Sequence, residues 1–274
     1  MVYKYSSVDQ LSYIKYILLL VQTLFKRRYF IKLLFIRIIK NRFKDSFLGI
    51  LWSLLSPMIS MIAIAIIFPL IMKFKVENYV VYLFSGFLGW HLISSSITNG
   101  GSSILSRAGL LKKYNIPKII FPVTVSLVEV FNFMITFFAL LLVLLILGYE
   151  YTINLSYLTL TFFVTYIFAL SLSIISSVVF VYFRDLQHLI SIFMQALFYL
   201  TPIIYLVSII PERYMVFMNL NIFYHYINLF HGSIYDDRII TYNSFLVPSL
   251  ISLTSLVISL IIFKKLEKNL IYRF

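Results

Sequence analysis

One acidic side chain, Glu129, lies inside a long apolar stretch that runs from about residue 119 to 147. An ionised carboxylate is costly in hydrocarbon, so Glu129 should face other helices, find a partner or stay protonated. Two readings are open: a polar path through the membrane, or a structural hydrogen bond to a neighbouring helix. Ser95 and Ser173, in other apolar stretches, pose a similar choice between lining a channel and permitting close helix packing. For the serines we favour packing.

The remaining polar residues do not form a catalytic or metal-binding pattern. The four histidines stand at no metal-ligand spacing, and the chain has no P-loop motif for ATP. It has no cysteine, which excludes disulfides and thiolate cofactor sites. Asp236 and Asp237 are adjacent and would point apart in a regular element. We therefore expect no catalytic residue, cofactor or metal in this chain.

These side chains must be positioned by membrane helices, because 61% of the 274 residues are hydrophobic and 12% are charged. A hydrocarbon core about 30 Å thick needs roughly 20 helical residues. Long continuous apolar runs indicate helices rather than the alternating strands of a barrel. The sequence thus predicts an all-α integral membrane fold with six spans. They lie at about 47–72, 80–98, 119–147, 156–183, 186–209 and 244–263.

The placement of Lys and Arg predicts the orientation of these spans. With both termini inside, the inner segments hold 19 of these cations and the outer segments hold four. Both termini are therefore expected in the cytoplasm, and the net charge of +13 is explained by anionic lipids rather than nucleic acid. One alternative stays open at residues 11–25, which are apolar but short and carry Lys15. If they spanned the bilayer, the N-terminus would lie outside.

The stretch KNRFKDSFLGILWSLLSP, at 40–57, passes from cations to apolar sequence without a spacer. Helical spacing over residues 36–48 predicts an amphipathic helix at the membrane interface, with cations at the lipid headgroups. A simple topological anchor is the other reading. The predicted apolar stripe consists of Ile36, Ile39, Phe43 and Phe47.

Two connections are more informative than ordinary loops. Residues 99–118 include ILSRAGLLKKY, a short apolar ridge with a basic flank that could dock into a soluble partner or anchor at the interface. Residues 198–245 are apolar but interrupted, which favours a re-entrant helical pair that closes the outer mouth. Most of the aromatic residues fit membrane belts and core packing, while a minority could stack against sugar rings.

Several motifs at conforming spacing resemble the membrane subunit of bacterial ABC exporters for lipid-linked polysaccharides, namely the permease family for O-antigen, capsule and teichoic acid. They cover most of residues 36–270. The motifs are RFKDSFLGILWSLLSP at 42–57, YLFSGFLGWHLISSSITNGGSSILS at 82–106, LLKKYNIPKIIFP at 110–122, VYFRDLQHLISIF at 181–193, YLTPIIY at 199–205 and FKKLEKNL at 263–270.

The resemblance implies a transporter permease rather than an enzyme. It implies a homodimer with a channel near the dimer interface, and two copies of a separate ATPase subunit that binds ATP and Mg. The implied substrate is an undecaprenyl-pyrophosphate-linked polysaccharide, moved from the cytoplasmic to the outer leaflet of the bacterial inner membrane. Residues 26–274 would form one transmembrane domain, and the extension 1–25 has no assigned role.

The resemblance also implies roles for individual residues. A helix at 104–114 would couple to the ATPase, and helices at about 209–231 would form the outer gate. An interfacial helix continuous with span one, bending at Gly49 and Pro57, would meet the substrate headgroup. The implied coupling residues are Arg107, Leu110, Leu111, Lys112, Lys113 and Tyr114, and the implied headgroup residues are Arg37, Lys40, Arg42 and Lys44. Span four would end at the cytoplasmic face with Arg184 and Asp185. The implied gate residues are Pro211, Tyr214, Phe223 and Tyr224, and the implied channel residues are Glu129, Ser95 and Ser173.

The sequence departs from the family pattern where Asn221-Ile222 replaces an Asn-Pro pair, which loosens the gate boundaries. Two rival functions remain. An ABC exporter of a drug or lipid would share the architecture. An integral-membrane glycosyltransferase would need paired acids in cytoplasmic loops, and the acids expected there, Asp9, Asp45, Asp185 and Glu267, are isolated.

Overall fold

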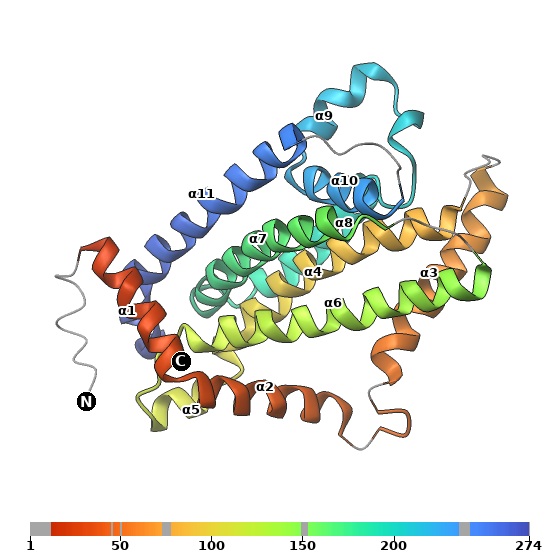
Figure 1. The fold of residues 1–274 in the computed structure, drawn as a ribbon. Helices are drawn as coiled ribbons and strands as arrows, with labels where there is room; N and C mark the ends of the chain where they lie inside the picture. Colours follow the sequence, from red (N-terminus) through yellow and green to blue (C-terminus); the bar gives the residue numbers. More distant parts are fainter. Residues whose placement is uncertain are drawn as a thin grey trace.

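The computed structural model describes residues 12–44, 46–49, 51–72, 78–148, 153–235 and 242–273, and these form a helical bundle (Figure 1). Within them, five helices are long and apolar enough to cross a membrane. These are α3 (Leu51–Met72), α4 (Tyr79–Leu105), α6 (Ile120–Leu147), α7 (Leu155–Tyr182) and α11 (Tyr242–Glu267). The shorter elements are α1 (Tyr13–Lys26), α2 (Arg28–Phe43), α5 (Ala108–Lys113), α8 (Leu186–Leu200), α9 (Met215–Leu220), α10 (Ile222–Ile234), η2 (Val207–Ile209), η3 (Glu212–Tyr214) and η4 (Lys268–Arg273).

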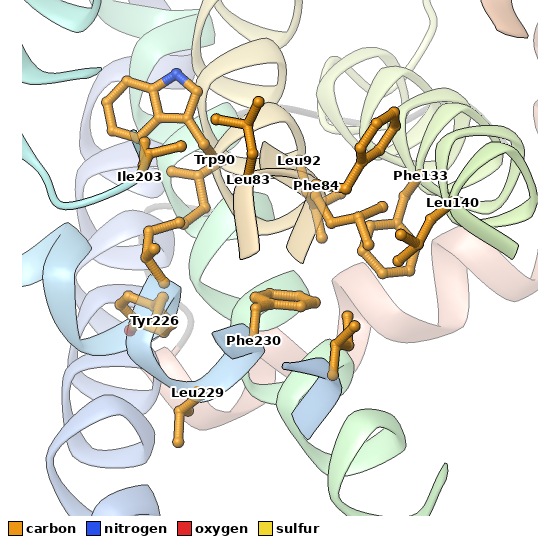
Figure 2. Packing of buried hydrophobic residues seen from close by; sticks show 14 of the residues in the cluster. Leu83, Phe84, Trp90, Leu92, Phe133, Leu140, Ile203, Tyr226, Leu229 and Phe230 are labelled. Atoms are coloured by element: carbon orange, nitrogen blue, oxygen red, sulfur yellow. The ribbon is translucent and has the colours of Figure 1, made fainter. Parts of the chain in front are cut away.

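Helices α4 and α7 form the centre of the bundle, and α6, α10 and α11 pack around them. Figure 2 shows Tyr226 and Phe230 of α10 among buried side chains that include Phe84 of α4 and Phe133 of α6. Helix α3 packs less closely, against α6 and α4, and most of its apolar surface is exposed. The rigid core of the bundle is therefore the unit formed by α4, α6 and α7.

Small residues let α4 and α7 approach closely. A Cβ added at Gly101 would lie 2.2 Å from Cε2 of Phe180, and one added at Gly100 would lie 2.0 Å from Oγ of Ser173. Ser173 also donates a hydrogen bond to the carbonyl oxygen of Pro122, at 3.2 Å. Glycine and serine thus serve here as packing residues between membrane helices.

We expect Gly101→Ala to lower the free energy of unfolding by about 1–3 kcal/mol, because the added methyl group overpacks the contact with Phe180. Thermal unfolding of the protein in detergent measures this loss. Gly109→Ala in α5 is the matched control, since a Cβ there meets nothing within 4 Å. Equal unfolding temperatures for the two variants would contradict this account of the α4–α7 contact.

Both described ends of the chain lie at one end of the bundle, where α1, α2, α5 and η4 gather (Figure 1). We call this the basal end, and the opposite end, built from residues 201–235, the apical end.

Helix α1 has 14 residues, a length of about 21 Å, which is shorter than a membrane span. It packs at the base of α11 through Tyr16.

Most predicted spans match a helix, with three corrections. The second predicted span, 80–98, continues to Leu105, so residues 99–105 belong to α4 and the expected coupling helix shrinks to α5. The fifth, 186–209, stops at Leu200 after 15 residues, about 22 Å. It stops because Thr201 precedes Pro202 and takes an extended conformation, with φ −96° and ψ 136°.

The third correction concerns the predicted continuous helix from the interface into span one. Helix α2 ends at Phe43, and α3 begins at Leu51. Gly49, between them, has a φ of 51° in the left-handed region, so the chain turns there in a connection between two separate helices rather than bending within one continuous helix. Pro57 lies inside α3 instead. Of the predicted apolar stripe, Ile39 and Phe43 are half-buried, whereas Ile36 and Phe47 are exposed. The apolar residues through which α2 packs on the bundle also include Phe30, Ile31, Leu34, Phe35 and Ile38.

Candidate functional site

The Glu129 carboxylate is the centre of a buried polar cluster between α2, α4 and α6. Its side chain is 1% exposed and accepts hydrogen bonds from Nδ2 of Asn132 at 2.7 Å and Nδ2 of Asn99 at 2.9 Å. A guanidinium nitrogen of Arg42 lies 3.8 Å from Oε1 of the same carboxylate. Two predicted site residues from separate groups, Glu129 and Arg42, are therefore brought together.

Two polar stripes position this cluster. On α4, His91, Ser95 and Asn99 follow one another at intervals of four residues. On α6, Glu129 and Asn132 are three residues apart and share a face. Sequence reasoning missed Asn99, Asn132 and His91, although the helical spacing of both stripes was visible in the sequence.

A cavity of about 370 Å³ opens beside the cluster. Hydroxyl, amide, imidazole and guanidinium groups line it together with one indole ring. Nδ1 of His91 is buried without a hydrogen-bond partner among the described residues. Such a lining can hydrogen-bond the polar part of an amphiphile while the open side contacts apolar chains. The polar and aromatic lining residues are Arg42, Phe43, Ser46, Trp52, Ser53, Ser56, His91, Asn132 and Thr136.

The four cations predicted to meet a headgroup do not gather in one place. Arg42 faces the cavity and Glu129, whereas Arg37 points the other way and lines the surface next to α5. Lys40 and Lys44 are exposed. Arg42 is therefore the predicted headgroup cation that reaches the candidate site.

A second surface lies at the basal end, in the groove between α2 and α5. Two hollows of about 580 and 560 Å³ share Leu34, Arg37 and Leu110, and Arg107 lines the second. Lys112 and Lys113 of α5 and Tyr114 directly after it are exposed beside these hollows, Tyr114 with 61% of its surface. We call these three residues and the groove the α5 surface.

Leu111 is not part of the α5 surface. It is 6% exposed and packs into a basal core with Ile119, Ile120 and Phe121. The predicted pair of docking leucines is thus divided: Leu110 faces the groove and Leu111 holds α5 on the bundle.

At the apical end, the segment after α8 folds back over α4. Tyr79 donates to the carbonyl oxygen of Ile204 at 2.6 Å, and Tyr82 donates to those of Pro202 and Tyr205 at 3.0 and 2.7 Å. The His231 ring of α10 stacks on Tyr82 with centroids 4.0 Å apart. These bonds satisfy carbonyl groups of the non-helical segment that follows α8.

The predicted gate residues fall into three environments. Pro211 and Tyr214 are exposed around η3. Phe223 packs in the core, with its ring centroid 5.6 Å from that of Trp90. Tyr224 lines an apical cavity of about 430 Å³ together with Tyr82, Asn228, His231 and Tyr235. Asn221 caps α10 by accepting from the Phe223 N–H at 3.0 Å, which fixes the boundary that the sequence left loose.

The remaining predicted site residues, Ser95, Arg184 and Asp185, lie away from the cavities described above. Ser95 is buried and donates to the carbonyl oxygen of His91, one turn earlier in α4. Arg184 and Asp185 are exposed in the turn between α7 and α8. Among the residues that the structure describes, no group of three His, Asp or Glu side chains could hold a metal ion.

Comparisons with known proteins agree with this architecture. A family profile described as "ABC-2 type transporter" matches residues 29–235. The chain is 33% identical over 179 residues to the O-antigen export system permease protein RfbA of Klebsiella pneumoniae, covering 64% of this chain and 68% of that protein. It is 31% identical over 198 residues to the RfbA permease of Myxococcus xanthus, covering 71% and 75%. It is 23% identical over 244 residues to the polysialic acid transport protein KpsM of Escherichia coli, covering 88% and 95%.

Proposed function

Because this chain belongs to the ABC-2 type transporter family of membrane proteins, we propose that it is the membrane subunit of an ATP-driven exporter for a lipid-linked polysaccharide. The observation that carries the proposal is its similarity to two O-antigen export permeases and a polysialic acid transport protein. The substrate is a glycan on undecaprenyl pyrophosphate, moved from the inner to the outer leaflet. ATP and Mg bind to a separate ATPase subunit.

The cavity beside Glu129 is the proposed entry point for the substrate headgroup. It lies between α2, α3, α4 and α6, where the exposed apolar face of α3 offers a place for the prenyl chain. Hydroxyl and amide groups suit sugar hydroxyls, and Arg42 suits a phosphate oxygen. Glu129 partly neutralises Arg42, which limits how tightly an anion is held and so favours its release.

The basal end is proposed to face the cytoplasm, with both termini there. Its cations fit the rule that cytoplasmic segments retain Lys and Arg. Two ATPase subunits would dock on the α5 surfaces of two permease chains. The exposed cations at this end include Arg27, Arg28, Lys32, Lys40, Lys112, Lys113 and Lys265.

A homodimer is proposed for the membrane part. Helices α3 and α8 each leave a broad apolar face uncovered, and a second copy with two-fold symmetry would cover part of it and enclose a channel. The exposed apolar residues include Ile59, Ile62, Ile66 and Leu70 of α3, and Leu189, Ile192 and Phe193 of α8.

Deletion of this chain from its host should cause an undecaprenyl-linked saccharide to accumulate inside the cell, because synthesis continues while export stops. Lipid extraction, mild acid release of the glycan and mass spectrometry measure the accumulation. A plasmid copy of the chain should reverse it. If a different lipid or a drug accumulates and the glycan does not, the substrate assignment is wrong and the drug or lipid exporter is correct.

A further inference from the structure

Two elements outside the family match at residues 29–235, α1 and the C-terminal end of the chain, contact each other at the basal end. The Tyr16 hydroxyl of α1 donates a hydrogen bond to Oε2 of Glu267, at 2.9 Å. The Lys264 ammonium lies 4.4 Å from the ring centroid of Tyr13 and 5.5 Å from that of Tyr16. In Figure 1, α1 crosses the C-terminal end of α11.

Glu267 also contacts the segment that joins α5 to α6. Lys118 in that segment is fully buried, and its Nζ donates to the backbone carbonyl oxygen of Glu267 at 2.6 Å. Burial lowers the pKa of Lys118, and the nearby Glu267 carboxylate opposes this shift. A buried lysine is costly unless its donors are used, so this contact is a specific arrangement and not a solvated surface charge.

The basal core surrounds these polar contacts. Leu111 of α5, Phe263 of α11 and Leu270 of η4 belong to it, together with Leu20 of α1. Tyr182 at the end of α7 donates to the carbonyl oxygen of Leu266, at 3.3 Å. Helix α5 is thus held on the bundle at two points, by Leu111 within it and by Lys118 just after it.

This arrangement matters for the transmission of force. Between α5 and α6 the backbone at residues 114–117 is not helical. A push on α5 would be absorbed by bending of that segment unless a contact bypassed it and its far end were fixed. Leu111 supplies the bypass, because it packs in the basal core with Phe263 of α11. Lys118 fixes that end to α11, and α1 covers the junction through Tyr16. A displacement of α5 would then move α6 and α11 together rather than be absorbed by the linker.

We propose that Tyr16, Lys118 and Glu267 form a basal clasp, a set of positioning residues that transmits movement of α5 to α11, and that α1 serves to close it. The proposal rests on the proposed function, because it takes the ATPase to act on α5. It assigns a role to the N-terminal extension, for which sequence analysis gave none.

The first test needs neither ATPase nor substrate. Hydrogen–deuterium exchange of the purified full-length chain in lipid nanodiscs should show amides of residues 108–118 exchanging about fivefold faster in Tyr16→Phe and in Lys118→Met, because each change removes a partly buried hydrogen bond to Glu267. Tyr29→Phe, on the exposed side of α2, is the control and should exchange like the wild type. Unchanged exchange at 108–118 in both clasp variants would overturn the proposal.

The second test separates positioning from simple stability. In proteoliposomes with the ATPase, Tyr16→Phe should export severalfold less glycan per ATP hydrolysed, while the ATPase remains bound. A purely structural role would lower hydrolysis and export in parallel with the amount of assembled complex, and that result would overturn the coupling role. If the wild-type complex exports no glycan, the proposed function fails, and the exchange measurement still decides whether the clasp holds α5.

Discussion

A chain with Glu129→Leu should lose about 1–4 kcal/mol of its free energy of unfolding, and its unfolding temperature should fall accordingly. Two buried amides, those of Asn99 and Asn132, would lose their acceptor. In a water-soluble core each loss costs about 1–3 kcal/mol. In bilayers side-chain hydrogen bonds average nearer to 0.6 kcal/mol, because separated helices find other partners, so the expected loss for the two amides begins at about 1 kcal/mol. Size-exclusion chromatography and thermal unfolding in detergent measure the loss.

Arg42→Met is the matched variant, because it removes the third partner of the same carboxylate. The Arg42 side chain is 41% exposed and 3.8 Å from Glu129, so its loss should change stability by less than about 1 kcal/mol. Export should nevertheless fall if Arg42 meets the substrate phosphate. Should Arg42→Met unfold the chain as severely as Glu129→Leu, the ion pair and not the two amides would dominate the cluster.

The helices were predictable because their signal is local. Hydropathy alone predicted 119–147 and 156–183, and α6 and α7 differ from these ranges by at most one residue at either end. Local chemistry sets such ends: Asn154 caps α7 by accepting from the Tyr157 N–H at 3.2 Å. A hydropathy window cannot place a break within an apolar run, and for that reason the fifth span was predicted nine residues too long.

The site was predictable only where one helix contains the whole pattern. A buried Glu129 with a polar partner followed from its place in the sequence, and Asn132 lies one helical turn away. Asn99 and Arg42 become partners through the register of α4 and α2 against α6, which no local pattern contains. Leu111 illustrates the same limit, because an apolar residue on a short basic helix fits a partner's groove and the protein's own core equally well.

Charge reversal on α5 should detach the ATPase without unfolding the permease. Lys112→Glu together with Lys113→Glu places two acids on an exposed basic surface, where like-charge contact with an acidic partner costs several kcal/mol. Since each 1.4 kcal/mol is a factor of ten, retention of the ATPase on the tagged permease should fall by at least about tenfold. Pull-down of the co-expressed subunits measures the retention.

The control pair is Lys15→Glu with Lys265→Glu, which makes the same change of net charge at exposed positions of the basal end away from α5. It should retain the ATPase if the subunit docks, as proposed, on the α5 surface rather than in response to the total charge. Leu111→Asp adds a third comparison: it buries a carboxylate in the basal core and should unfold the chain even without the ATPase. If instead Leu111→Asp leaves a folded permease that has lost its ATPase, Leu111 contacts the partner directly, and α5 must leave the bundle when the ATPase binds.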